Sequence, residues 1–84
     1  MTHYLKTLPA HFNSVKRGNK RFEIRNNSDR GFQKGEMVIL CEYFPETKKF
    51  SGAEIMTIIT YVTNFEQKPN MVVFGFNVME DTDK

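Results

Sequence analysis

Residues 7–18 read TLPAHFNSVKRG and predict a helix from Pro9 to Arg17 near the start of the chain. Proline is favoured at the first helical position because its missing N–H group would have no partner there. The basic residues of the last turn suit the helix dipole, and the closing glycine supplies a left-handed stop. The helix is expected to place three apolar side chains on one face: Leu8, Phe12 and Val15.

The segments around this helix have the composition of strands. They are rich in β-branched and aromatic residues, several of them alternate with polar residues, and glycine, proline and asparagine punctuate the gaps. The expected strands cover 3–7, 20–25, 37–44, 53–63 and 71–78, and they are joined by a loop over 26–34, a hairpin tip over 45–52 and a loop over 64–70.

This order predicts an α+β protein that is mostly β. A single early helix among antiparallel strands indicates a small barrel of about five strands with the helix plugging one end. Phe12 and Val15 should then be buried, and the alternation in residues 71–78 should turn Val72, Phe74, Phe76 and Val78 to one face. The 84 residues predict one domain, with an acidic, frayed tail over 79–84.

Several classes of protein are disfavoured by the composition. Cys41 is the one cysteine and lies in an apolar run, so we expect a small buried side chain and no disulfide. The apolar stretches are shorter than the ~18 residues that span a bilayer, and the first residues do not resemble a signal peptide. We therefore expect a cytoplasmic protein that is not in a membrane and has no cofactor.

The charge is distributed unevenly. The net charge is +2, but residues 16–34 hold seven basic and two acidic residues, a local balance of 7 − 2 = +5, which leaves 2 − 5 = −3 for the rest. A basic segment beside an acidic remainder indicates one electropositive face that would attract phosphate. A solvated charged loop explains the same segment, and the charge alone does not separate the two.

The residues after the helix match a known pattern. Residues 18–25 read GNKRFEIR, which fits G-x-K-x-x-E-x-R and resembles the signature of the ASCH superfamily. Residues 5–12 resemble the opening of a small ASCH-like family of unknown function in bacteria and their phages. Residues 29–36 resemble that family's D-R-x-F-x-x-G-D, with Glu36 where Asp is usual and a preceding loop one residue longer. Further similarities are Glu42-Tyr43, Ser51-Gly52 and Val72-Val73-Phe74-Gly75.

The resemblance implies a PUA-like fold over residues 1–84 and binding of RNA or a nucleotide-like ligand. A few small ASCH members are amidohydrolases that act on acylated cytidine-type nucleosides. Those enzymes carry a lysine with a threonine three residues later, whereas here Lys20 is followed at that offset by Glu23. The enzymatic activity is therefore not carried over whole.

The candidate ligand-binding residues are mostly charged residues of this segment. Glu23 and Arg25 are two residues apart, so their side chains project from the same side of a strand. Lys20 joins them if a turn or bulge at Gly18 precedes the strand. An ionised carboxylate accepts hydrogen bonds from a base, and a guanidinium suits phosphate. An exposed ladder of ion pairs is the competing interpretation. The full candidate set is Lys6, Lys20, Glu23, Arg25, Asp29 and Arg30.

Other chemistry-bearing residues form weaker patterns. His3 and His11 are eight residues apart, without ligand-spaced partners, so no metal site is expected. His11 is expected on the helix surface. The aromatic residues Tyr43, Phe44 and Phe50 either stack on bases or pack in the core and at the hairpin tip.

Three functions fit the sequence. The first is a non-catalytic module that binds RNA or a nucleotide in a basic cleft between helix and barrel. The second is a small hydrolase of an amide-bearing nucleoside, with Lys20 as base or nucleophile and Glu23 as its partner. The third is a protein-interaction domain, such as a phage factor that acts on a host partner. The sequence does not give the oligomeric state.

Overall fold

A computed structural model of the chain describes residues 1–28 and 30–79. Its elements follow the order β-α-β-β-β-β that the sequence predicts. They are β1 (Thr2–Thr7), α1 (Pro9–Lys16), β2 (Phe22–Asn26), β3 (Met37–Phe44), β4 (Lys49–Thr63) and β5 (Met71–Val78).

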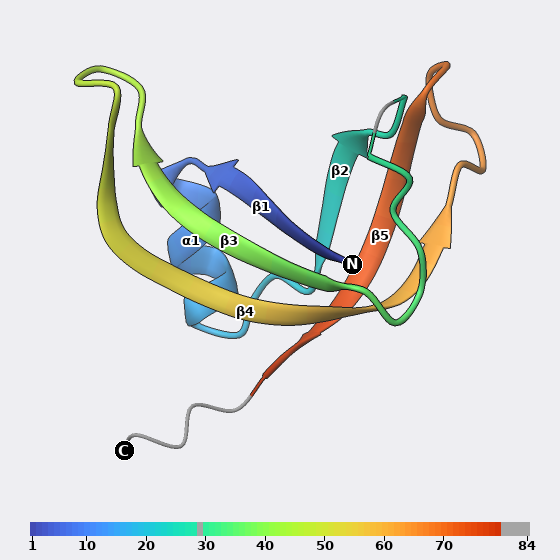
Figure 1. Cartoon of the computed structure of the whole chain (residues 1–84), viewed down its shortest axis with the longest axis horizontal. Helices are drawn as coiled ribbons and strands as arrows, with labels where there is room; N and C mark the ends of the chain where they lie inside the picture. Colours follow the sequence, from blue (N-terminus) through green and yellow to red (C-terminus); the bar gives the residue numbers. More distant parts are fainter. Residues whose placement is uncertain (29, 80–84) are drawn as a thin grey trace.

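The five strands form one sheet in the order β1-β3-β4-β5-β2. The sheet curls into a half-barrel, with α1 lying alongside β1 and β3 (Figure 1). This confirms the mostly β α+β class with one early helix. One pairing differs from the antiparallel expectation, because β1 runs parallel to β3 while the other pairs are antiparallel. Parallel neighbours need a long crossover, and here α1 and β2 occupy it.

The helix and the inward faces of the strands make one core. Phe12 and Val15 are 3% and 1% exposed, which confirms the predicted plug, and α1 packs on β3. Leu8 was expected beside them but is 48% exposed. Its backbone is extended (φ −62°, ψ 149°) because it caps the helix, so it lies outside the helical spacing. On β5 the predicted inward side chains are buried at Val72, Phe74 and Phe76 and partly buried at Val78.

Several boundaries differ from the prediction: β1 begins one residue earlier, at Thr2, and β2 covers Phe22–Asn26 in place of 20–25. The hairpin tip is shorter than expected, since β4 begins at Lys49 and the glycine assigned to the tip, Gly52, lies inside the strand with φ +93°. The register of β3 against β4 shifts between Cys41 and Tyr43, opposite this glycine. The left-handed backbone of Gly52 therefore accommodates a β-bulge in β4. Met79 was assigned to the tail, but its N–H donates to Met56 O at 2.8 Å; residues 80–84 lie outside the described residues.

A buried histidine holds the start of β1 against the start of β3. His3 is 4% exposed, its Nε2 donates to Glu36 Oε1 at 2.7 Å, and its ring lies 4.7 Å from that of Phe32. The hydrogen bond from His3, followed by one from the backbone of Gln33, lowers the pKa of the Glu36 carboxyl below its usual value.

We expect this pair to make the fold sensitive to acid. Because the folded-state pKa of Glu36 lies below its unfolded value, its contribution is complete above the unfolded pKa and is lost as pH falls through the lowered one. Glu36→Gln should cost about 1 kcal/mol at pH 7 and should flatten the stability loss below about pH 4.5. Urea unfolding at several pH values measures both effects, with Glu46→Gln at the exposed hairpin tip as control. An unchanged pH dependence in Glu36→Gln would contradict the assignment.

Candidate functional site

Strand β2 turns its charged side inward. Its apolar residues Phe22 and Ile24 are 46% and 49% exposed, whereas Glu23 is 4% exposed and Arg25 is partly buried. This inverts the usual arrangement, in which the apolar side of a strand faces the core. The predicted alternation is therefore correct, but the charged face is not a solvent-exposed ladder.

Glu23 is a buried carboxylate between two cations. Its Oε1 accepts a hydrogen bond from Arg25 Nε at 3.3 Å, and Lys20 Nζ lies 3.5 Å from its Oε2. Within residues 1–28 and 30–79, Oε2 is buried and accepts no hydrogen bond. Buried polar atoms are nearly always hydrogen-bonded, so an oxygen that is ion-paired with Lys20 at 3.5 Å but accepts no hydrogen bond is a candidate for a further partner.

Lys20 reaches Glu23 because the chain turns before β2 begins. Gly18 has φ +85°, and the N–H groups of Asn19 and Lys20 both donate to Ser14 O at 2.9 and 3.2 Å. This turn folds the segment back on the end of α1. It confirms the predicted convergence of Lys20 with Glu23.

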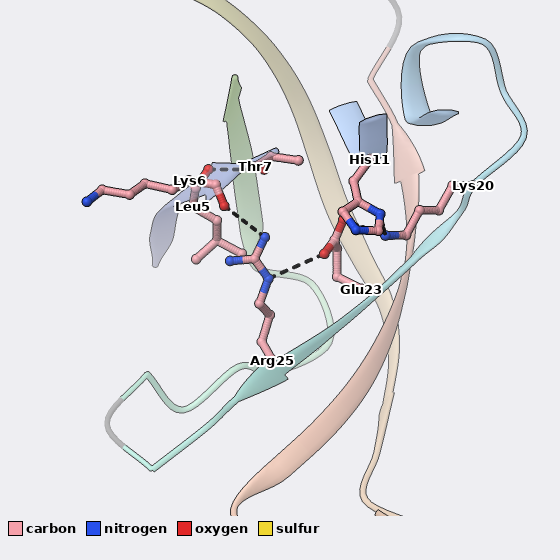
Figure 2. Close-up of polar contacts among 7 residues, drawn as sticks. All are labelled: Leu5, Lys6, Thr7, His11, Lys20, Glu23 and Arg25. Atoms are coloured by element: carbon pink, nitrogen blue, oxygen red, sulfur yellow. Dashed lines mark hydrogen bonds and ion pairs between the residues drawn. The ribbon is translucent and has the colours of Figure 1, made fainter. Parts of the chain in front are cut away.

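The same turn brings Lys20 to the helix. Lys20 Nζ donates to His11 Nδ1 at 3.0 Å, so His11 borders the site although its ring is exposed (Figure 2). The sequence assigned His11 to the helix surface and missed this contact. No spacing rule predicts it, because it depends on the path of the turn.

Two arginine side chains link β1, one edge strand of the sheet, to β2, the other edge strand, and to the loop that follows β2. β1 is an edge strand, and the carbonyl groups on its outer side need partners. Arg25 Nη2 donates to Lys6 O at 3.0 Å, and Arg30 Nη1 donates to Tyr4 O at 3.3 Å. Arg25 thus lies between β1 and Glu23, as Figure 2 shows.

A cleft of about 430 Å³ lies along this edge. The Lys6 ammonium lies 4.7 Å from the centre of the Tyr43 ring and points away from Glu23 (Figure 2). Phe50 packs on Tyr43 at 4.9 Å and remains 54% exposed, so the pair offers an aromatic surface beside the cations. The cleft is lined by Tyr4, Leu5, Lys6, Arg25, Arg30, Cys41 and Phe50.

The predicted residues fall into two groups that meet at Arg25. Lys6 and Arg30 line the cleft with it, and Lys20 and Glu23 adjoin it on the side of the helix. Asp29 lies outside the described residues. The cleft was expected between the helix and the barrel, but it lies at the edge of β1. Among the described residues, helix α1 contributes none to the lining of the cleft, and of the two groups it contacts only the Lys20–Glu23 cluster, through His11.

Four cleft residues were outside the predicted set: Tyr4, Leu5, Cys41 and Phe50, of which Phe50 was weighed only for stacking or packing. Tyr4 is 59% exposed, and its alternation with Lys6 on β1 is the signal that could have found it. Cys41 was expected to be a small buried residue; it is partly buried and lines the cleft. Burial, followed by the nearby Glu54 carboxylate, raises the pKa of its thiol, so the side chain stays protonated at neutral pH.

The described part of the chain holds neither a metal cluster nor a spanning helix. Among residues 1–28 and 30–79, no three His, Cys, Asp or Glu side chains gather where they could hold a metal ion. No helix in those ranges has the length and hydropathy needed to cross a membrane.

Comparison with known proteins gives a family without an assigned role. A search of curated proteins finds no match. A family model described as Domain of unknown function (DUF3850) matches residues 2–76, which is nearly the whole of the chain. The chain therefore belongs to the DUF3850 family.

Proposed function

We propose that this protein is a non-catalytic module that binds RNA or a nucleotide-like ligand at the β1 edge. The observation that carries the proposal is Glu23: a carboxylate 4% exposed, held between Lys20 and Arg25, whose Oε2 is ion-paired with Lys20 at 3.5 Å but accepts no hydrogen bond among the described residues. A nucleobase amino group is a donor that would satisfy this oxygen. Leaving such an atom without a hydrogen bond costs free energy, which ligand binding would recover.

The surroundings of Glu23 suit the rest of a nucleotide. Arg25 and Arg30 present guanidinium groups to the cleft, and planar forks of this kind bind phosphate oxygens in pairs. Tyr4 and Phe50 are the exposed aromatic residues of the same cleft, and bases stack on such rings. The phosphate and the base of one nucleotide therefore find matching groups within a single cleft and its margin.

The wider ASCH relationship is part of this proposal. The residues of G-x-K-x-x-E-x-R come together in space: Gly18 makes the turn, and Lys20, Glu23 and Arg25 form the charged cluster. Because the turn at Gly18 is what brings Lys20 to Glu23, all four positions contribute to one cluster, and this supports the proposal that DUF3850 belongs among the ASCH domains. A cytoplasmic location fits as well, since a single thiol, Cys41, needs no oxidising compartment.

Glu23→Gln tests the proposal directly. Glutamine keeps the size of the side chain and the acceptor for Arg25, but it puts an N–H₂ group where a ligand donor would arrive. We expect binding of cytidine 5′-monophosphate or a short RNA to weaken about tenfold or more, by fluorescence anisotropy or calorimetry. Glu46→Gln, at the exposed hairpin tip, is the matched control and should bind like wild type. Equal affinity in Glu23→Gln would remove the observation on which the function rests.

A hydrolase is the second candidate, because Lys20, Glu23 and His11 form a cluster of proton-transfer groups. A lysine nucleophile or base needs a free amino group, whereas Lys20 Nζ is held by Glu23 Oε2 at 3.5 Å and by His11 Nδ1 at 3.0 Å. We therefore expect no turnover of N4-acetylcytidine when its conversion to cytidine is followed by chromatography. Turnover that disappears in Lys20→Ala would replace the binding function with the hydrolase.

A further inference from the structure

A second cavity, of about 310 Å³, lies beyond the end of β2. Carboxamides dominate its lining, and Lys68 is the one charged residue among the described side chains that form it. Such groups each carry donors and an acceptor without charge. The cavity is lined by Asn27, Asn64, Gln67, Lys68, Pro69, Asn70, Met71 and Val72.

Backbone hydrogen bonds join the two segments that line this amide pocket. Asn27 N–H donates to Asn70 O at 2.7 Å and ties the end of β2 to the loop over 64–70. Within that loop, Gln67 N–H donates to Asn64 O at 3.1 Å. The side chain of Asn27 is itself oriented, because its Oδ1 accepts the N–H of Phe32 at 2.8 Å. A pocket fixed in this way loses little conformational entropy when it binds a ligand.

The amide pocket adjoins the cationic cleft through one cross-strand pair. Arg25 of β2 is the register partner of Val72 on β5, and Val72 lines the amide pocket while Arg25 lines the cleft. Asn27 follows Arg25 by two residues, which along an extended chain is a rise of about 7 Å. The two cavities are therefore neighbours on either side of Arg25.

We propose that the amide pocket binds the base of a second nucleotide, adjacent to the one whose phosphate lies at Arg25. This rests on the proposed function and adds a strand of RNA as the ligand class. Asparagine and glutamine pair in a bidentate manner with the N6 and N7 atoms of adenine, and a lining made mostly of uncharged amides suits an uncharged base. Adenine is accordingly the base that the pocket accepts best.

The test compares a one-nucleotide ligand with an oligonucleotide. Cytidine 5′-monophosphate reports on the Glu23–Arg25 site, and octaadenylate reports on both cavities. In Asn64→Ala/Gln67→Ala we expect octaadenylate to bind about tenfold more weakly and cytidine 5′-monophosphate to bind as in wild type. The loss should be the same at low and high salt, since amides release no counterions. Asn13→Ala/Gln33→Ala removes two exposed amides elsewhere and is the control.

The outcomes distinguish failure of the amide-pocket proposal from failure of the proposed function on which it rests. If wild type binds cytidine 5′-monophosphate but the amide variant binds octaadenylate with unchanged affinity, the pocket is not a subsite, and the Glu23 site stands. An equal loss for both ligands assigns the amides to support of the fold and also overturns the inference. If wild type binds neither ligand, the proposed function and the inference fail together. The near-isosteric Asn64→Leu/Gln67→Met removes the amides without adding charge, and it gives the same test should the alanine variant not fold.

Discussion

The Lys20→Ala/Arg25→Ala variant is expected to bind single-stranded RNA about 100-fold more weakly than wild type at 0.15 M salt. Each side chain would contribute a charge-assisted hydrogen bond to phosphate, worth roughly 1.5–3 kcal/mol. The dependence of log K on log salt should also become shallower by about 1.4, because about 0.7 counterions are released per phosphate contact on a single strand. Titrations at several salt concentrations give the affinity and the slope together.

Two comparisons make this result specific. Lys34→Ala/Lys49→Ala removes the same charge from exposed positions away from the cleft and should change the slope little. The alanine pair also leaves the buried carboxylate of Glu23 without cations, which can cost several kcal/mol of stability. Lys20→Gln/Arg25→Gln keeps polar partners for Glu23 and serves if the alanine variant unfolds. Equal slopes and equal affinity in wild type and variant would reject the contact surface.

Phe12→Ala is expected to lower the free energy of unfolding by about 3–5 kcal/mol. The side chain is 3% exposed in the common core, and its removal leaves a cavity between α1 and the sheet. A domain of this size has a total stability on the order of 4–13 kcal/mol, so the variant should lose much of its stability or unfold at 37 °C. Urea unfolding followed by circular dichroism measures the change.

Leu8→Ala is the control on the same segment. Leu8 is 48% exposed at the cap of α1, so its truncation should cost less than about 1 kcal/mol. Similar losses in Phe12→Ala and Leu8→Ala would contradict the assignment of α1 as the plug of the half-barrel.

The parts of the fold that depend on local signals were predictable. The observed bounds of β3 and β5 agree with the prediction residue for residue, since both segments combine β-branched residues with clear turn signals at their ends. The helix ends one residue earlier than predicted, at Lys16. The parallel β1–β3 pairing was missed because the position of a strand in a sheet depends on long-range contacts that carry no local pattern.

The candidate site was predictable in composition but not in form. Alternation places Glu23 and Arg25 together on β2, but it does not say which side of the strand is inside. In the fold Phe22 and Ile24 take the outer side, and this converts an apparent surface ladder into a buried carboxylate. The arginine bonds to the β1 carbonyls could not be predicted, because they require the two ends of the sheet to approach each other.

Nitrogen-15 NMR with a titrated RNA octamer tests the central claim most directly. If the ligand lies against Glu23 and Arg25, the largest shifts should fall on the Arg25 Nε–H and on the backbone amides of 20–26 and 4–7, in fast or intermediate exchange. The convex face around Met56 and Ile58, which is exposed and lies on β4, should stay unchanged. Shifts confined to that face, or an unaltered spectrum at saturating RNA, would contradict binding at the β1 edge.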